Sequence, residues 1–126
     1  MNMPKILIID DSWFSIRFYS KFFKELGFDI EYKKNGQDAI DEIEDIRPDL
    51  VLCDLLMPNI SGFDTLAGLK KKMPNLRVYV VSADIQEFTK ERVLALGAID
   101  CIHKPLTKEK AENILIRENL LQGVTV

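Results

Sequence analysis

LVLCDLLMPNISG, residues 50–62, is the stretch that decides the fold of this chain. Four apolar residues, 50–53, end at Asp54, and a loop containing Pro58 and Gly62 follows. An unbroken apolar run of this length is typical of a short strand buried on both faces. A carboxylate at the end of a buried strand costs free energy unless neighbouring groups compensate it. Asp54 is therefore the first candidate functional residue.

Similar apolar runs recur along the chain, and longer amphipathic segments separate them. The expected strands are residues 6–9, 28–32, 50–53, 78–81 and 99–102, and the expected helices are 12–26, 37–46, 63–73, 86–96 and 107–121. Ser12 and Thr107 are predicted N-caps, and Gly27 and Gly97 are predicted to end helices. Five strand-then-helix units predict an α/β fold, a doubly wound (βα)5 three-layer sandwich around a parallel sheet.

The composition narrows the possible function. The chain has 126 residues and a net charge of −3, which fits one domain and argues against direct nucleic-acid binding. No apolar stretch is long enough for membrane insertion. Cys53 and Cys101 show no disulfide spacing, which favours a cytoplasmic location. With no linker visible, residues 1–126 are expected to form a single domain.

Polar residues follow four of the expected strands. Asp10 and Asp11 follow the first strand, Asp54 the third, Ser82 ends the fourth, and Lys104 follows the fifth. The carboxyl ends of parallel strands lie at one edge of the sheet, where ligands bind in such folds. Three carboxylates, a hydroxyl and an ammonium group are therefore expected to converge.

This combination of groups indicates phosphoryl chemistry. Three close carboxylates repel one another, so cations must offset them. Lys104 is one such cation, and an all-oxygen site favours Mg²⁺ as the second. Attack by Asp54 on a phosphoryl group would give an acyl phosphate, with Ser82 donating to a phosphoryl oxygen. Each motif alone also fits an ordinary helix start or turn; only their joint occurrence favours a site.

These residues resemble the receiver domain of two-component response regulators. The resemblance runs from about residue 5 to residue 121 and rests on Asp10-Asp11-Ser12, Asp54 with Met57-Pro58 and Gly62, Ser82-Ala83, Gly97-Ala98 and Lys104-Pro105. It implies a flavodoxin-like sheet with five parallel strands in the order 2-1-3-4-5. The bond between Lys104 and Pro105 is often cis in this family.

The resemblance also implies a role for each site residue. Asp54 would be the phosphoacceptor, and Lys104 would contact the phosphoryl group. Ser82 would be the switch hydroxyl. Mg²⁺ would be held by Asp10, Asp11, Asp54 and the backbone carbonyl of Leu56. The side chain of Leu56 should hinder hydrolytic water, whereas Asp84 could help to orient it.

The partners are implied in the same way. The phosphoryl donor would be a sensor histidine kinase or a phosphotransfer protein. With no output domain expected, a chemotaxis-like, stand-alone receiver would signal by docking onto a downstream protein target, as a monomer or a phosphorylation-dependent dimer.

Two positions depart from the family pattern. Cys101 lies where receivers commonly carry Tyr or Phe, three residues before the lysine. Either the coupled aromatic switch is absent or weakened, or Cys101 merely fills space in the strand. His103 is the only histidine. Its neighbours show no metal-ligand spacing, so a satisfied or solvent-facing side chain is expected.

The first expected helix is rich in aromatic residues. Seven of the chain's eleven aromatic residues lie between Trp13 and Phe28. Phe18, Phe22 and Leu26 form the expected core stripe. Trp13 and Ile16 fall on another face and are a possible partner surface. The alternative is that they pack under the neighbouring loop.

The sequence therefore predicts a phosphorylation-activated switch that catalyses only its own phosphoryl transfer and dephosphorylation. An aspartyl-phosphate phosphohydrolase would need a second acid after the nucleophile and a cap domain. Leu56 occupies the position of that acid. A flavodoxin-like cofactor binder would need a phosphate-binding loop after the first strand, but Asp10 and Asp11 occupy that position and would repel phosphate without a metal. A pseudo-receiver scaffold would not need the acids, the hydroxyl and the lysine.

Overall fold

Strands and helices alternate along the chain in this computed structural model, which describes residues 3–83 and 86–121. The strands are β1 (Lys5–Ile9), β2 (Asp29–Lys33), β3 (Leu50–Cys53), β4 (Val78–Ser82) and β5 (Asp100–His103). The helices are α1 (Trp13–Glu25), α2 (Gly36–Ile46), α3 (Gly62–Lys72), α4 (Glu87–Ala95) and α5 (Lys108–Arg117).

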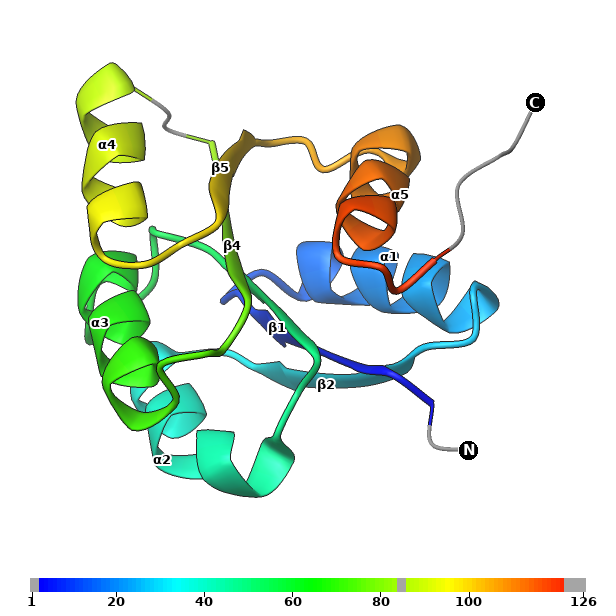
Figure 1. Ribbon diagram of the computed structural model, residues 1–126, viewed down its shortest axis with the longest axis horizontal. Coiled ribbons are helices and arrows are strands. Elements are labelled where there is room, and N and C mark those ends of the chain that lie inside the picture. The colour runs from blue at the N-terminus through cyan, green and yellow to red at the C-terminus, as the bar shows by residue number, and fades with distance from the viewer. Residues whose placement is uncertain (1–2, 84–85, 122–126) are drawn as a thin grey trace.

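The strands form one parallel sheet in the order β2-β1-β3-β4-β5. Helices α1 and α5 cover one face of the sheet, and α2, α3 and α4 cover the other (Figure 1). The predicted class and strand order are confirmed. Because every strand runs in the same direction, the residues after β1, β3, β4 and β5 all lie at one edge.

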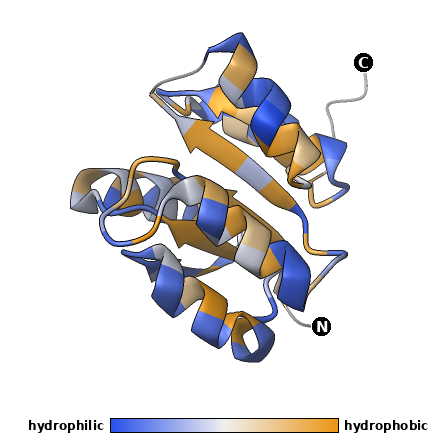
Figure 2. Cartoon of the chain, turned by 90° about the vertical axis from the view of Figure 1, so that its left-hand side faces the viewer, coloured by the Kyte–Doolittle hydropathy of each residue, from blue (hydrophilic) through white to orange (hydrophobic). Residues whose placement is uncertain are grey.

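Two apolar layers hold the sandwich together. One lies between the sheet and α1 with α5, and the other lies between the sheet and α2, α3 and α4. The central strands β1, β3 and β4 are largely hydrophobic, whereas the helices alternate hydrophilic and hydrophobic residues (Figure 2). All four residues of β3 are buried, as a strand covered on both faces requires.

The predicted helix boundaries are largely confirmed. The side chains of Ser12 and Thr107 accept hydrogen bonds from backbone N–H groups of the first turns of α1 and α5. Gly27 and Gly97 have φ of 90° and 105°, which favour glycine at helix ends. Helix α5 ends at Arg117 rather than at residue 121, because Asn119 turns the chain with φ of 60°.

The predicted faces of α1 were partly wrong: Phe22 is buried as expected, but Ile16 and Phe18 lie on the opposite faces to those predicted. Ile16 was placed on a partner surface, but it is buried with 2% exposure, whereas Phe18, placed in the core, is 45% exposed. The buried stripe is Ile16, Tyr19, Phe22 and Phe23. Both stripes keep spacings of three and four, so periodicity alone could not choose between them. The packing of α1 on the sheet determines which of the two stripes is buried.

No helix in the described residues is both long enough and apolar enough to span a membrane.

Candidate functional site

The backbone holds Asp54 at the edge of the sheet. Its N–H donates to the carbonyl of Ile9 at 2.9 Å, which continues the pairing of β3 with β1 by one residue. The side chain is buried, with the residue 7% exposed. One oxygen, Oδ1, accepts from the N–H of Leu56 at 3.3 Å. The fold therefore carries Asp54 to a fixed position where the ladder ends.

Gly62 allows the loop after Asp54 to close. A Cβ at this position would lie 2.5 Å from the carbonyl oxygen of Asp54 and 2.3 Å from Cα of Leu55. Those are backbone atoms that cannot move aside without shifting the strand end. The N–H of Gly62 also donates to the carbonyl of Leu55 at 3.0 Å. A glycine is needed here so that α3 can begin against the strand end.

Asp10 and Asp11 occupy the equivalent place after β1. Asp10 is buried, and its Oδ1 accepts from the N–H of Ser12 at 2.9 Å, whereas Asp11 is exposed. One ligand oxygen from each of Asp10, Asp11 and Asp54 lies within 4.8 Å of the others. The predicted convergence of three carboxylates is present.

Lys104 joins this cluster from β5. Its Nζ donates to Oδ2 of Asp10 at 3.0 Å and to Oδ2 of Asp54 at 3.1 Å. The backbone N–H of Lys104 donates to the carbonyl of Ser82 at 2.8 Å, and the bond to Pro105 is cis. The ammonium group thus bridges the two buried carboxylates.

The electrostatics of the site follow from this arrangement. Burial raises the pKa of Asp54; the Lys104 charge and the hydrogen bonds from Lys104 and Leu56 only partly offset it, and Asp10 adds to the rise. Burial lowers the pKa of Lys104, but its hydrogen bonds and charge attraction to Asp10 and Asp54 outweigh burial, so that pKa is raised. One ammonium group does not fully balance three carboxylates.

The donor set fits a divalent cation that prefers oxygen. The cluster offers carboxylate oxygens and no sulfur or imidazole ligand among its three members, which suits Mg²⁺. Leu56 lies beside the cluster with its side chain 61% exposed. A ligand role for its backbone carbonyl stays a prediction.

The remaining predicted residues lie near the same edge. Ser82 is buried at the end of β4. Cys101 is buried on β5 and is paired with Val80 of β4. His103 is exposed, with Nε2 3.0 Å from the carbonyl oxygen of Ala83. The switch roles of Ser82 and Cys101 stay predictions, and Asp84 lies outside the described residues.

Trp13 is half exposed at the start of α1. Its ring makes an edge contact with Tyr32 at 5.2 Å between centroids, and Nζ of Lys34 lies 4.6 Å from its centroid. The exposed side keeps a partner role for Trp13 open as a prediction. Ile16 is no part of such a surface because it is buried.

An apolar groove beside Lys104 was missed by sequence reasoning. The groove has a volume of about 460 Å³ and is lined by Phe14, Ser15, Phe18, Tyr19, Lys104, Pro105, Leu106 and Thr107. Phe14 is 82% exposed at its mouth. The concentration of aromatic residues in α1 was the available signal. The choice of face depended on how α1 packs against the turn after β5.

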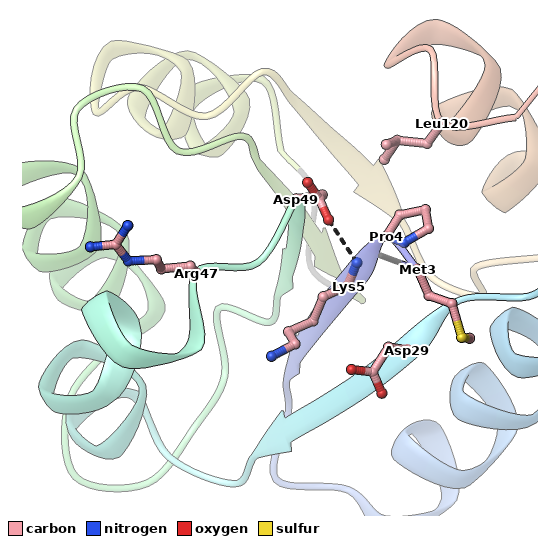
Figure 3. A pocket seen from close by; sticks show the side chains of 7 residues that line it. All are labelled: Met3, Pro4, Lys5, Asp29, Arg47, Asp49 and Leu120. Atoms are coloured by element: carbon pink, nitrogen blue, oxygen red, sulfur yellow. Dashed lines mark hydrogen bonds between the residues drawn. The ribbon is translucent and has the colours of Figure 1, made fainter. Parts of the chain in front are cut away.

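A second cavity lies at the opposite edge of the sheet. It has a volume of about 810 Å³ and is lined by residues at the starts of strands, with the N–H of Lys5 donating to Asp49 at 2.7 Å (Figure 3). Asp29 and Arg47 also line it. No member of the acidic cluster does, so this cavity is separate from the candidate site.

Comparisons with known proteins show the family of the chain. The family model described as response regulator receiver domain matches residues 6–116. Chemotaxis protein CheY of Listeria monocytogenes is 30% identical over 86% of this chain and 92% of its own length. A protein-glutamate methylesterase/protein-glutamine glutaminase of Geobacter sulfurreducens is 37% identical over 98% of this chain, which spans only 34% of that relative.

Solved structures give the same result. A CheX–CheY complex with BeF3 and Mg²⁺ from Borrelia burgdorferi aligns with a TM-score of 0.86 and 28% identity, over 90% of this chain and 87% of that chain. CheY4 of Vibrio cholerae aligns with a TM-score of 0.86 at 23% identity, over 92% of this chain and 98% of that chain, which supports the fold.

Proposed function

Because the chain belongs to the response regulator receiver domain family, we propose that it is a phosphorylation-activated switch that accepts a phosphoryl group on Asp54. Receiver domains are signalling switches, and their chemistry is acceptance and loss of one phosphoryl group. The observation that carries the proposal is the Lys104 ammonium, which bridges Asp10 and Asp54 inside the acidic cluster.

The residues divide the work of the reaction. A carboxylate oxygen of Asp54 attacks phosphorus; the O–P bond forms as the bond to the donor's imidazole nitrogen breaks, and that nitrogen takes up a proton. Lys104 already lies 3.1 Å from Oδ2 of Asp54, so it can follow the incoming phosphoryl oxygens. Asp10, Asp11 and Asp54 would hold Mg²⁺, which would supply further positive charge to those oxygens.

The donor must reach Asp54 from the open edge of the sheet. The groove lined by Phe14, Phe18 and Pro105 continues directly from Lys104 along α1. Its apolar lining suits the apolar face of a helical domain that carries a phosphohistidine, either a sensor histidine kinase or a phosphotransfer protein. We therefore assign donor docking to this groove, with Trp13 at its N-terminal flank on the same helix.

The response to phosphorylation is assigned to the surface formed by α4, β5 and α5. Asp100 joins these three elements, because Lys90 of α4 lies 3.7 Å and Arg117 of α5 lies 3.2 Å from its carboxylate oxygens. Ser82, at the end of β4, connects the site with this surface. Because Cys101 stands in place of an aromatic ring, we assign the change to the ion pairs around Asp100. A downstream protein target would bind according to that change.

Dimer formation and a cytoplasmic location stay predictions.

Two alternatives use the same residues differently. An aspartyl-phosphate phosphohydrolase would turn over phosphomonoesters and needs a general acid near the nucleophile, where this chain has the apolar, exposed Leu56. A pseudo-receiver scaffold would bind partners without accepting a phosphoryl group. The intact set of Asp10, Asp11, Asp54 and Lys104 favours the switch.

Intact-mass measurement separates these possibilities. The chain is incubated with acetyl phosphate and Mg²⁺, and with a phosphomonoester in a parallel reaction. We expect the mass of one phosphoryl group to be added from acetyl phosphate, and no addition in Asp54→Asn or in wild type with EDTA. No adduct on the wild type would favour the scaffold, and repeated release of phosphate from the monoester would favour the hydrolase.

A further inference from the structure

Tyr19 brings a hydroxyl group close to the phosphorylation site from α1. The residue is 7% exposed and belongs to the apolar layer between the sheet and the two helices α1 and α5. Its ring makes an edge contact with Phe18 at 5.9 Å between centroids. Tyr19 also lines the groove together with Lys104 and Leu106, so it faces both the core and the site.

The surroundings of the hydroxyl are polar on one side. It lies beside the side chain of Ser15 and the backbone of Leu106, within electrostatic reach of Lys104 and Asp10. Burial raises the pKa of Tyr19 and Asp10 adds to the rise, whereas Lys104, Ser15 and Leu106 lower it by less. The hydroxyl therefore stays protonated at neutral pH and acts as a neutral dipole.

Leu106 belongs to the turn that begins with Lys104. On the strand side, this turn is fixed by the hydrogen bond from the Lys104 N–H to the carbonyl of Ser82 at 2.8 Å. On the helix side, Leu106 is buried with 2% exposure and lines the groove together with Tyr19, whose hydroxyl lies near the Leu106 backbone. The path of the turn sets where the ammonium of Lys104 can lie.

We propose that Tyr19 is a positioning residue for phosphoryl acceptance. Its ring and hydroxyl hold the turn of residues 104–106 against α1 and so fix the approach of the Lys104 ammonium to a phosphoryl group on Asp54. The inference rests on the proposed function. It goes further because Tyr19 is no member of the acidic cluster and would act through Lys104, with which it lines the groove.

A domain that docks in the groove should affect Tyr19. Phe14 and Phe18 at the mouth share the groove with Tyr19 and Lys104. A domain that fills the groove therefore presses on the residue that positions the ammonium group. Docking and the reactivity of Asp54 become coupled through one side chain.

The test compares Tyr19→Phe with Tyr32→Phe. The first variant removes only the hydroxyl next to the turn, and the second removes a hydroxyl from β2, where the ring packs on Trp13. Acetyl phosphate labelling is followed by intact mass to obtain the maximal rate and the half-saturating concentration. Melting temperature and Mg²⁺ affinity are measured on the same samples.

For Tyr19→Phe we expect the maximal labelling rate to fall about 5- to 10-fold, because a small misplacement of a charge-stabilising group lowers the rate by this factor or more. The half-saturating acetyl phosphate concentration, the Mg²⁺ affinity and the melting temperature should stay close to wild type. Tyr32→Phe should match wild type. In a Lys104→Ala background, Tyr19→Phe should have no further effect, because the two residues act in series.

The outcomes separate the two ideas. If the wild type accepts no phosphoryl group, the proposed function fails. If the wild type is labelled and Tyr19→Phe is labelled at the same maximal rate, the positioning role fails while the function stands. An equal additional loss in the Lys104→Ala background would also overturn the positioning role, because Tyr19 would then act independently of Lys104.

Discussion

The buried carboxylate of Asp54 is in an electrostatically unfavourable environment, which favours binding of a cation or a phosphoryl group. Its carboxylate is buried beside Asp10, and the single ammonium of Lys104 is shared between the two. A bound cation or a phosphoryl group with its cation restores the balance. The proposed phosphoacceptor is thus held in an unfavourable environment beforehand, as is common for reactive groups.

The raised pKa of Asp54 predicts how stability changes with pH. In the folded chain this carboxyl binds its proton more tightly than in the unfolded chain, so its contribution favours folding at low pH and is lost as pH rises through the raised pKa. Without metal at neutral pH, ionised Asp54 destabilises the fold. Asp54→Asn should therefore raise the melting temperature by a few degrees, in EDTA at pH 7.

The matched control for this prediction is Asp45→Asn, which removes the same charge from an exposed position on α2. It should change the melting temperature little. The gain in Asp54→Asn should shrink as the pH falls toward the ordinary aspartate pKa of 3.8. A lower melting temperature for Asp54→Asn at pH 7 in EDTA would contradict the view that the carboxylate is strained.

At the scale of single elements, α1 connects the site with the groove that we propose as the donor docking surface. Its N-cap, Ser12, follows Asp10 and Asp11 directly, and its exposed aromatic residues continue away from Lys104. The existence of α1 and its N-cap could be predicted, because capping and helix periodicity are local properties. Its buried face could not, since stripes through Ile16 and through Phe18 both satisfy helical spacing.

If the donor docks on the groove face of α1, removal of an exposed ring from that face should slow transfer. Phe14→Ser should slow transfer from a histidine phosphotransfer domain that labels the wild-type chain by about 10-fold, because it removes a largely exposed ring from the mouth of the groove. Labelling by acetyl phosphate should not change, because that small donor needs no docking. Both rates can be read from the same intact-mass assay.

Phe88→Ser is the control for surface apolarity, since Phe88 is 70% exposed on α4. It should leave transfer from the protein donor close to wild type. If Phe88→Ser slowed the transfer and Phe14→Ser did not, the donor would dock on the α4 side, and the assignment of the groove would be wrong.

At the scale of the whole molecule, the topology assembles the site. Asp10, Asp54 and Lys104 are far apart in sequence but follow three strands of one parallel sheet. For this reason the acidic cluster could be predicted from strand ends alone. The groove and the position of Tyr19 could not, because they depend on how α1 packs against the turn after β5, which no local pattern encodes.

Metal binding should consequently stabilise the entire fold. Mg²⁺ that binds only the folded site adds about 2.7 kcal/mol to the free energy of unfolding at a concentration 100 times its dissociation constant. Thermal unfolding with and without Mg²⁺ measures this effect. Asp11→Asn should largely abolish it, because Asp11 is an exposed member of the cluster whose loss costs the fold little.

Asp29→Asn provides the comparison at the opposite edge, where Asp29 lines the cavity of Figure 3. It should retain the full stabilisation by Mg²⁺. Equal stabilisation of wild type and Asp11→Asn would show that the cation binds elsewhere on this acidic chain.

The most direct measurement is to locate the phosphoryl group. The chain is labelled with acetyl phosphate and Mg²⁺, the acyl phosphate is reduced with borohydride to homoserine, and the modified position is read by peptide mass. We predict homoserine at Asp54 alone, with no conversion when Mg²⁺ is omitted. Homoserine at Asp10 or Asp11 instead, or none at any aspartate of an acetyl phosphate-treated sample, would contradict a switch that operates through Asp54.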